Sequence, residues 1–256
     1  MKTDWDYTDL AIPYLSRPNY SPVAIDAMLK ICDLEAGNHV CDVGAGVGHL
    51  SLMLADRGLQ VTAVEPNDAM RAGGINRSLK FSNISWNEGT GEATGQPSGL
   101  FKAVTFGSSF NVCNQQMALS ESARILTTGG WFACMWNHRD LTDEVQMEIE
   151  GIIKRWVPSF SYGERREDQF AIIEQSNLFQ KIVRLDARVD HLQSIEQIVQ
   201  AWKSHATLKR QANECFENII LEIHEFLKQK SPTIDETHRF KISYNTRIWV
   251  AQLTAT

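Results

Sequence analysis

The sequence predicts a single α/β domain with a mostly parallel sheet and helices on both of its faces. Residues 39–70 have the pattern of a strand, a glycine turn, a helix and a second strand. Two later apolar runs, 101–106 and 131–136, are separated by a helical pattern over 115–126. Strands that alternate with helices form parallel sheets, because each helix returns the chain to the same edge. The last run, 240–250, alternates apolar with polar residues and is expected to be an antiparallel strand.

The first strand, 40–43, runs directly into a turn that contains Gly44, Gly46 and Gly48. Glycine has no Cβ and tolerates positive φ, so a ligand can approach the backbone of such a turn closely. The amphipathic segment 50–54 begins a helix whose first N–H groups point toward the same place. The turn is therefore a predicted ligand site.

The residues around this turn indicate which ligand it binds. The spacing is G-x-G-x-G, whereas the dinucleotide fingerprint has its third glycine where His49 stands. Asp42 lies inside the first strand, where its charge would repel a pyrophosphate and attract a cation. Glu65 ends the second strand, 61–64, at the edge of the sheet where an acid suits a ribose diol. A ribose, a positive charge and no phosphate describe S-adenosylmethionine.

Two motifs then carry a family resemblance. The stretch DVGAGVG at 42–48, followed by VEP at 64–66, resembles motif I and the acidic motif of class I S-adenosylmethionine-dependent methyltransferases, of the type that acts on small molecules. The string SESARILTTGGWFACMWN at 120–137 also resembles that family, with Thr128 in place of the common proline. The resemblance implies S-adenosyl-L-methionine as cofactor and a seven-stranded Rossmann-like sheet in the order 3-2-1-4-5-7-6. A glycine turn that holds no ligand is the alternative.

The resemblance also implies further cofactor contacts. Arg17 is expected to meet the methionine carboxylate, and Met70 to pack on the adenine. Backbone groups of 91–93 are expected to hold the adenine, although Thr90 or Gly91 stands where the family usually has an acid. A surface arm around Arg17 and a plain core role for Met70 are the alternatives. The expected cofactor-binding residues are Tyr14, Arg17, Asp42, Gly44, Ala45, Gly46, Gly48, Glu65, Pro66, Met70, Gly91, Glu92, Ala93, Ser108 and Phe110.

The carboxyl end of the fourth strand, 107–111, is where the sulfonium and the methyl acceptor are expected to meet. Ser108, Phe110 and Asn111 are predicted to line this place, and a tight polar turn is the alternative. Lys102 departs from the family, which commonly has an aspartate at the start of this strand.

The chain beyond residue 140 changes character. Helical patterns over 141–156, 194–202 and 216–227 surround an alternating strand at 183–189. We expect helices within 141–175 and 194–232 to form a lid inserted over the ligand edge. The prediction is one methyltransferase domain, with a cofactor-binding core over 1–140 and the lid and last two strands over 141–256.

Composition limits the possible partners. The 256-residue chain has a formal net charge of −6, which gives no general attraction to nucleic-acid phosphates. Its five cysteines are scattered without C-x-x-C spacing, as expected of reduced thiols and not of a disulfide framework or zinc site. The first ten residues, MKTDWDYTDL, have no leader pattern, and no apolar run approaches a membrane span. We therefore expect a cytoplasmic protein that acts on a small molecule, without metal, membrane or nucleic acid.

Methyl transfer is a displacement on an activated sulfonium, so alignment of the reactants can supply most of the rate. A base is needed only when the acceptor must lose a proton. His138 and His205 are the candidate catalytic residues, with an ordinary surface or capping role as the alternative for each. A cofactor-binding protein without catalytic activity is the second hypothesis, and a nucleotide-dependent dehydrogenase is the third.

Overall fold

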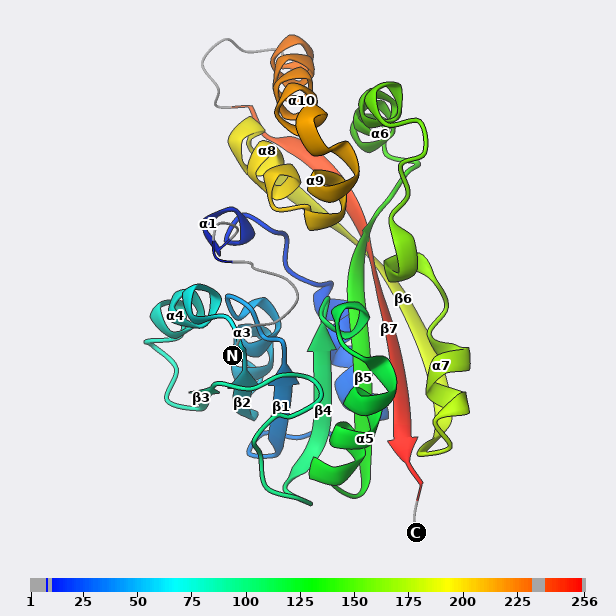
Figure 1. The fold of residues 1–256 in the computed structure, drawn as a ribbon. Coiled ribbons are helices and arrows are strands. Elements are labelled where there is room, and N and C mark those ends of the chain that lie inside the picture. The colour runs from blue at the N-terminus through cyan, green and yellow to red at the C-terminus, as the bar shows by residue number, and fades with distance from the viewer. Residues whose placement is uncertain (1–7, 9–10, 232–237, 255–256) are drawn as a thin grey trace.

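The computed structural model describes Thr8 and residues 11–231 and 238–254. Its centre is one seven-stranded sheet in the order β3-β2-β1-β4-β5-β7-β6, as the sequence predicts (Figure 1). The strands are β1 His39–Val43, β2 Gln60–Val64, β3 Ile84–Asn87, β4 Phe101–Gly107, β5 Leu126–Arg139, β6 Phe179–Gln193 and β7 Phe240–Leu253. β7 is antiparallel to both of its neighbours, β5 and β6.

The parallel strands bring their carboxyl ends to one edge of the sheet. β1 pairs in register with β2 and β4, and β4 pairs with β5. The segments that follow β1, β2, β4 and β5 therefore meet at this edge, which is where open α/β sheets bind ligands. The first of these segments is the glycine turn.

Helix boundaries follow capping residues in the sequence. Ser21, Asn67, Asn114 and Asp143 each accept a hydrogen bond from the first turn of the helix that they precede, and Ser194 forms a capping box. The helices are α1 Ala11–Tyr14, α2 Pro22–Ile31, α3 His49–Ala55, α4 Asp68–Arg77, α5 Gln115–Ile125, α6 Glu144–Trp156, α7 Phe170–Gln175, α8 Ile195–Lys203, α9 Ala206–Ala212 and α10 Phe216–Lys230. Short 3₁₀ turns occupy Phe110–Val112, Gly163–Arg166 and Asn213–Cys215.

Strands β5, β6 and β7 continue beyond the core and carry a second lobe. Helices α6 and α8–α10 flank the extended ends of these strands (Figure 1). The lobe has its own apolar core, in which Ile153, Trp202, Ile219 and Ile223 pack together with Tyr244 from β7. Two further apolar clusters lie in the sheet core. The second lobe is thus an independently packed layer attached through the sheet.

Three local features differ from the sequence prediction. β5 begins at Leu126, which pairs with Phe101, and the register shifts before Trp131 pairs with Ala103. The strand therefore begins before the predicted run 131–136, and the glycines before Trp131 lie within it. α9 follows α8 after a break at residues 204–205 that the apolar pattern does not indicate. α7 packs on α5 and β6 in the core instead of joining the lid.

Within the described ranges, none of the helices is long and apolar enough to cross a bilayer. Residues 1–7 and 9–10, on which the expected absence of a leader rests, lie outside the described residues.

Candidate active site

The glycine turn joins β1 to α3 and is held against β2. The N–H groups of Gly44 and Ala45 donate to the Val64 carbonyl at 2.8 and 3.1 Å. Gly44, at φ +65°, could not carry a side chain, because a Cβ there would lie 2.4 Å from Ser109 Cβ. A Cβ on Gly46 would meet no atom within 4 Å. The turn is therefore packed from below at Gly44 and open to the cavity at Gly46.

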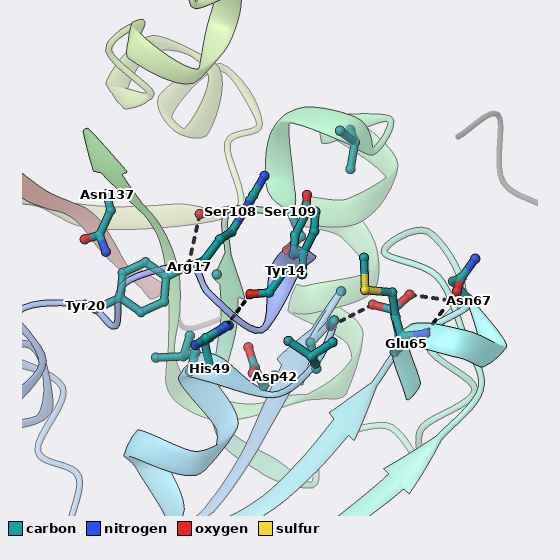
Figure 2. Close-up of a pocket in the computed structure, with 18 of the residues that line it drawn as sticks. Tyr14, Arg17, Tyr20, Asp42, His49, Glu65, Asn67, Ser108, Ser109 and Asn137 are labelled. Carbon is teal, nitrogen blue, oxygen red and sulfur yellow. Dashed lines mark hydrogen bonds between the residues drawn. The ribbon is translucent and has the colours of Figure 1, made fainter. Parts of the chain in front are cut away.

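Glu65 connects this turn to the next strand. One carboxylate oxygen accepts the Gly46 N–H at 2.8 Å, and the other accepts the Asn67 N–H at 2.9 Å (Figure 2). Burial raises the pKa of Glu65, and these two hydrogen bonds act in the opposite direction. A carboxylate has about four lone-pair sites, so roughly two remain for a ligand. Glu65 can thus bind a diol while it fixes the turn.

Asp42 lies beneath the glycine turn and lines the same cavity. It is fully buried and accepts hydrogen bonds from Ser51 Oγ at 2.6 Å and Thr105 Oγ1 at 3.0 Å. Burial raises the pKa of Asp42 to about 7, although both hydroxyl donors favour the charged form. A cation above the turn would favour the ionised carboxylate.

The segment 11–20 crosses the cavity as an arm between the core and the second lobe. His49 Nε2 lies 2.9 Å from the Tyr14 carbonyl, and Tyr20 Oη lies 3.0 Å from Ser108 Oγ (Figure 2). Arg17 stacks on Tyr14 and donates to Oγ and the carbonyl oxygen of Ser204 at 2.9 and 2.7 Å. Tyr14 and Arg17 line the cavity, and Arg17 also fastens the arm to the end of α8.

Residues on the β2 side form the wall expected to meet the adenine. Met70, which is 2% exposed, lines the cavity with Gly91 and Glu92. A Cβ on Gly91 would lie 2.5 Å from Cys113 Sγ, so this position has no room for a side chain. Glu92 also accepts the Asn114 N–H at 2.6 Å. Ala93 does not line the cavity, contrary to expectation, because its N–H donates to Thr90 and its side chain is exposed.

Three other expected cavity residues, Gly48, Phe110 and Asn111, also lie outside the lining. Phe110 is fully buried against Phe106 and Phe132, with ring centroids 5.4 and 5.2 Å away. Ser108, two residues earlier, has φ +62° and lines the cavity, whereas the Phe110 ring lies in the core. Gly48, at φ +84°, begins α3 beside the Trp86 ring and shapes the turn without lining the cavity.

The candidate catalytic histidines have different positions. His138 lies on β5 and is not part of the lining, whereas its neighbours Asn137 and Arg139 are, because successive strand residues face opposite sides. His205 does line the cavity, at the start of α9. Its Nδ1 accepts the Leu208 N–H at 3.1 Å, so the neutral ring carries its proton on Nε2.

The cavity includes residues that the sequence reading missed. It measures about 390 Å³ and runs from the β2 edge to the second lobe. The other predicted residues that line it are Asp42, Gly44, Ala45, Gly46, Glu65 and Pro66. The unpredicted ones include Tyr20, His49, Asn137 and Arg139. Asn137 and Arg139 follow the end of a predicted parallel strand, and this position could have indicated them.

Known proteins match both the sequence and the fold. A family model described as a methyltransferase domain matches residues 41–134. That match covers less than half of the chain, and it shows that residues 41–134 are similar to a methyltransferase domain. One relative in sequence is the ubiquinone/menaquinone biosynthesis C-methyltransferase UbiE of Zymomonas mobilis, which is 34% identical over 113 residues, or 43% of this chain and 47% of the relative. The chain spans about half the length of the curated relatives that it matches.

Two solved structures share the methyltransferase fold. A candidate type II methyltransferase from Anaeromyxobacter dehalogenans has a TM-score of 0.65 and 16% identity, with 94% of this chain and 99% of that one covered. Phosphoethanolamine N-methyltransferase 2 of Haemonchus contortus, solved with S-adenosyl-L-methionine, has a TM-score of 0.57 and 16% identity, with 100% of this chain and 59% of that one covered.

The Haemonchus contortus neighbour was solved with S-adenosyl-L-methionine. The cavity fits that group in three respects. Glu65 keeps acceptor capacity beside its two backbone hydrogen bonds, and Gly46 leaves open space where a side chain would otherwise stand. Asp42 supplies negative charge beneath the turn, where a sulfonium is favoured and a pyrophosphate is not.

Proposed function

We propose that the protein transfers the methyl group of S-adenosylmethionine to a small-molecule acceptor. The observation that carries this proposal is the continuity of the cavity. One space of about 390 Å³ is lined by Glu65 at one end and by His205 and Tyr244 of the second lobe at the other. A cofactor beside Glu65 and an acceptor beneath the lid would therefore share one enclosure, as ligand sites of this volume commonly do.

Three side chains would each bind a different part of the cofactor. Glu65 would accept hydrogen bonds from the ribose hydroxyls, and Met70 would pack on the adenine. Arg17 already uses Nε and Nη2 on Ser204, which leaves Nη1 to bind the methionine carboxylate. When bound, the cofactor supplies an activated sulfonium methyl group.

Rate enhancement would come mainly from alignment and exclusion of water. The arm is tied to α3 through His49, to β4 through Tyr20 and to α8 through Arg17. Through these contacts the arm would cover the place where the two reactants meet. Ser108 and Asn137 line the cavity here (Figure 2), and their side chains bind the arm: Ser108 Oγ lies 3.0 Å from Tyr20 Oη, and Asn137 Nδ2 donates to the carbonyl oxygens of Pro18 and Asn19.

His205 has a defined part in this arrangement. With Nδ1 accepting from Leu208, Nε2 carries the proton, so the ring is a hydrogen-bond donor. It would act as a base only after a change of tautomer that breaks the cap of α9. We therefore assign His205 to orienting the acceptor, and proton removal is not required for acceptors that attack as neutral nucleophiles.

Calorimetric titration of the full chain tests the binding half of this proposal. We expect S-adenosylhomocysteine and S-adenosylmethionine to bind at one site with micromolar dissociation constants, and NAD not to bind. Incubation with methyl-tritiated S-adenosylmethionine and a metabolite extract then tests transfer. Tight NAD binding would support a dehydrogenase, and cofactor binding without labelled product in any extract would support a non-catalytic protein.

A further inference from the structure

Arg139 is a charged residue of the cavity to which the proposed function gives no role. It is the last residue of β5 and lines the cavity beside the second lobe. Its guanidinium carbon lies 3.6 Å from the centroid of the Trp202 ring on α8. Its Nε is buried and has no hydrogen-bond partner among the described residues. Burial lowers the pKa of Arg139, but an arginine stays charged in proteins.

The surroundings of Arg139 provide more positive charge. The like charges of Arg17 and Arg166 add to the effect of burial and lower the pKa of Arg139 further. Arg166 donates to the Arg139 carbonyl at 3.0 Å and stacks on Tyr162 at 4.1 Å. These three guanidiniums contact a serine, a backbone carbonyl and aromatic rings. Among the side chains that the structure describes, which exclude those of residues 164 and 165, no acidic one pairs with them. Stacking on aromatic rings compensates such burial only in part.

Sheet topology separates Arg139 from the acids of the cavity. Glu65 follows β2, Asp42 lies in β1, and Arg139 ends β5, with β4 between β1 and β5. At the usual spacing of roughly 4.8 Å between strands, Arg139 is about 14 Å from the Glu65 position across the sheet. The cavity therefore has an acidic end beside the glycine turn and a cationic end beneath the lid.

We propose that the methyl acceptor carries an anionic group, a carboxylate or a phosphate, and that this group binds Arg139 between β5 and α8. The inference rests on the proposed function, because it assigns the lid end of the cavity to the acceptor. The planar guanidinium can bind either anion through two parallel hydrogen bonds. His205 and Tyr244 line this end with aromatic rings, and Tyr162 packs edge-on against His205 with ring centroids 5.9 Å apart, which suits an acceptor with a planar body.

Small aromatic anions can test this assignment before the acceptor is identified. We would saturate the protein with S-adenosylhomocysteine, add phenyl phosphate, benzoate or neutral benzamide, and measure the melting temperature and the dissociation constant of each probe. We expect phenyl phosphate or benzoate to bind and benzamide to bind at least tenfold more weakly. The stronger of the two anions distinguishes a phosphate-bearing acceptor from a carboxylate-bearing one.

Substitutions locate the binding of the probe. Arg139→Met keeps the length of the side chain and its contact with Trp202. It should weaken binding of the anionic probe at least tenfold, while the dissociation constant of S-adenosylhomocysteine changes less than threefold. Arg139→Lys keeps the positive charge but not the two parallel donors of the guanidinium, so it should weaken binding of the anionic probe by a smaller factor. Arg247→Met is the matched control, because Arg247 on β7 lies near the Trp249 ring but pairs with Asp186 outside the cavity. This control should retain anion binding.

Several results would overturn the inference and leave the proposed function standing. One is equal binding of benzamide and the anions, or no probe binding by a wild-type protein that binds S-adenosylhomocysteine. Another is unchanged anion binding by Arg139→Met. If Arg139→Met and Arg139→Lys no longer bind S-adenosylhomocysteine, Arg139 would instead bind the carboxylate of the cofactor. By contrast, a wild-type protein that does not bind S-adenosylhomocysteine would contradict the proposed function itself.

Discussion

His49 Nε2 lies 2.9 Å from the carbonyl oxygen of Tyr14, so the first residue of α3 holds the arm that covers the cavity. Nδ1 of the same ring lies 3.0 Å from Asn19 Oδ1. Burial, with Arg77 adding like charge, lowers the pKa of His49 to about 4, so the ring is neutral at pH 7. His49 occupies the place of the third glycine in the dinucleotide fingerprint, and a glycine there could not tether the arm.

Replacement of His49 by alanine should loosen the arm. The loss of its hydrogen bonds to the arm should weaken the binding of S-adenosylhomocysteine by about 1–2 kcal/mol, or roughly 5- to 30-fold in the dissociation constant. Hydrogen exchange of residues 14–20 should also become faster. His224→Ala on α10 is the control, since His224 lies outside the cavity lining, and it should change neither quantity. Unchanged exchange in His49→Ala would show that the arm is held without this residue.

Glu65 should account for a measurable part of cofactor affinity. Glu65→Ala removes the acceptor for the ribose and also the hydrogen bonds from Gly46 and Asn67. We expect a loss of about 1–3 kcal/mol in the binding of S-adenosylhomocysteine, measured by calorimetry. Glu65→Gln keeps the shape and part of the acceptor capacity, so its loss should be smaller. An unaltered dissociation constant in Glu65→Ala would place the ribose elsewhere.

Asp42 should make stability depend on pH in a defined direction. Its folded pKa of about 7 lies above the ordinary value of 3.8. Between these values the folded protein holds a proton that the unfolded chain has released, so the wild type loses stability as pH rises through this interval. Asp42→Asn cannot titrate. The stability of Asp42→Asn relative to wild type, measured by urea unfolding of the ligand-free proteins, should therefore rise by about 3 kcal/mol from pH 4.5 to pH 8. Parallel pH profiles for the two proteins would refute this account.

Gly44 should tolerate no side chain. Gly44→Ala combines a positive φ with a Cβ that would lie 2.4 Å from Ser109 Cβ. We expect the free energy of unfolding to fall by about 2–4 kcal/mol in urea titrations. Gly151→Ala in α6 is the matched control, because a Cβ there meets no atom within 4 Å and alanine favours the helix, so stability should rise by up to about 1 kcal/mol. Equal effects of the two substitutions would mean that the turn rearranges freely.

The part of the site that could be predicted from the sequence is the part specified locally. The turn from Gly44 to Gly48 and the acid at Glu65 follow directly from two adjacent strands. The role of Arg17 could not be predicted in full, because its hydrogen bonds go to Ser204, 187 residues away. Phe110 was placed wrongly because its ring packs against Phe106 and Phe132 in the core, and the second of these contacts comes from the next strand.

The second lobe shows the same limit. His138 was chosen on residue type. Because side chains alternate along β5, Asn137 and Arg139 line the cavity and His138 does not. The face that each residue of β5 presents depends on its long pairing with β7, which no local pattern contains. The helix that His205 caps was missed because it is only 7 residues long and has no strong apolar period of its own.

The most direct measurement is a crystal structure of the protein grown with excess S-adenosylhomocysteine. The account predicts the nucleoside in the cavity, with both ribose hydroxyls within hydrogen-bond distance of the Glu65 carboxylate and the adenine against Met70. Density for the nucleoside at another place, or a cavity that stays without it at saturating concentration, would contradict the account.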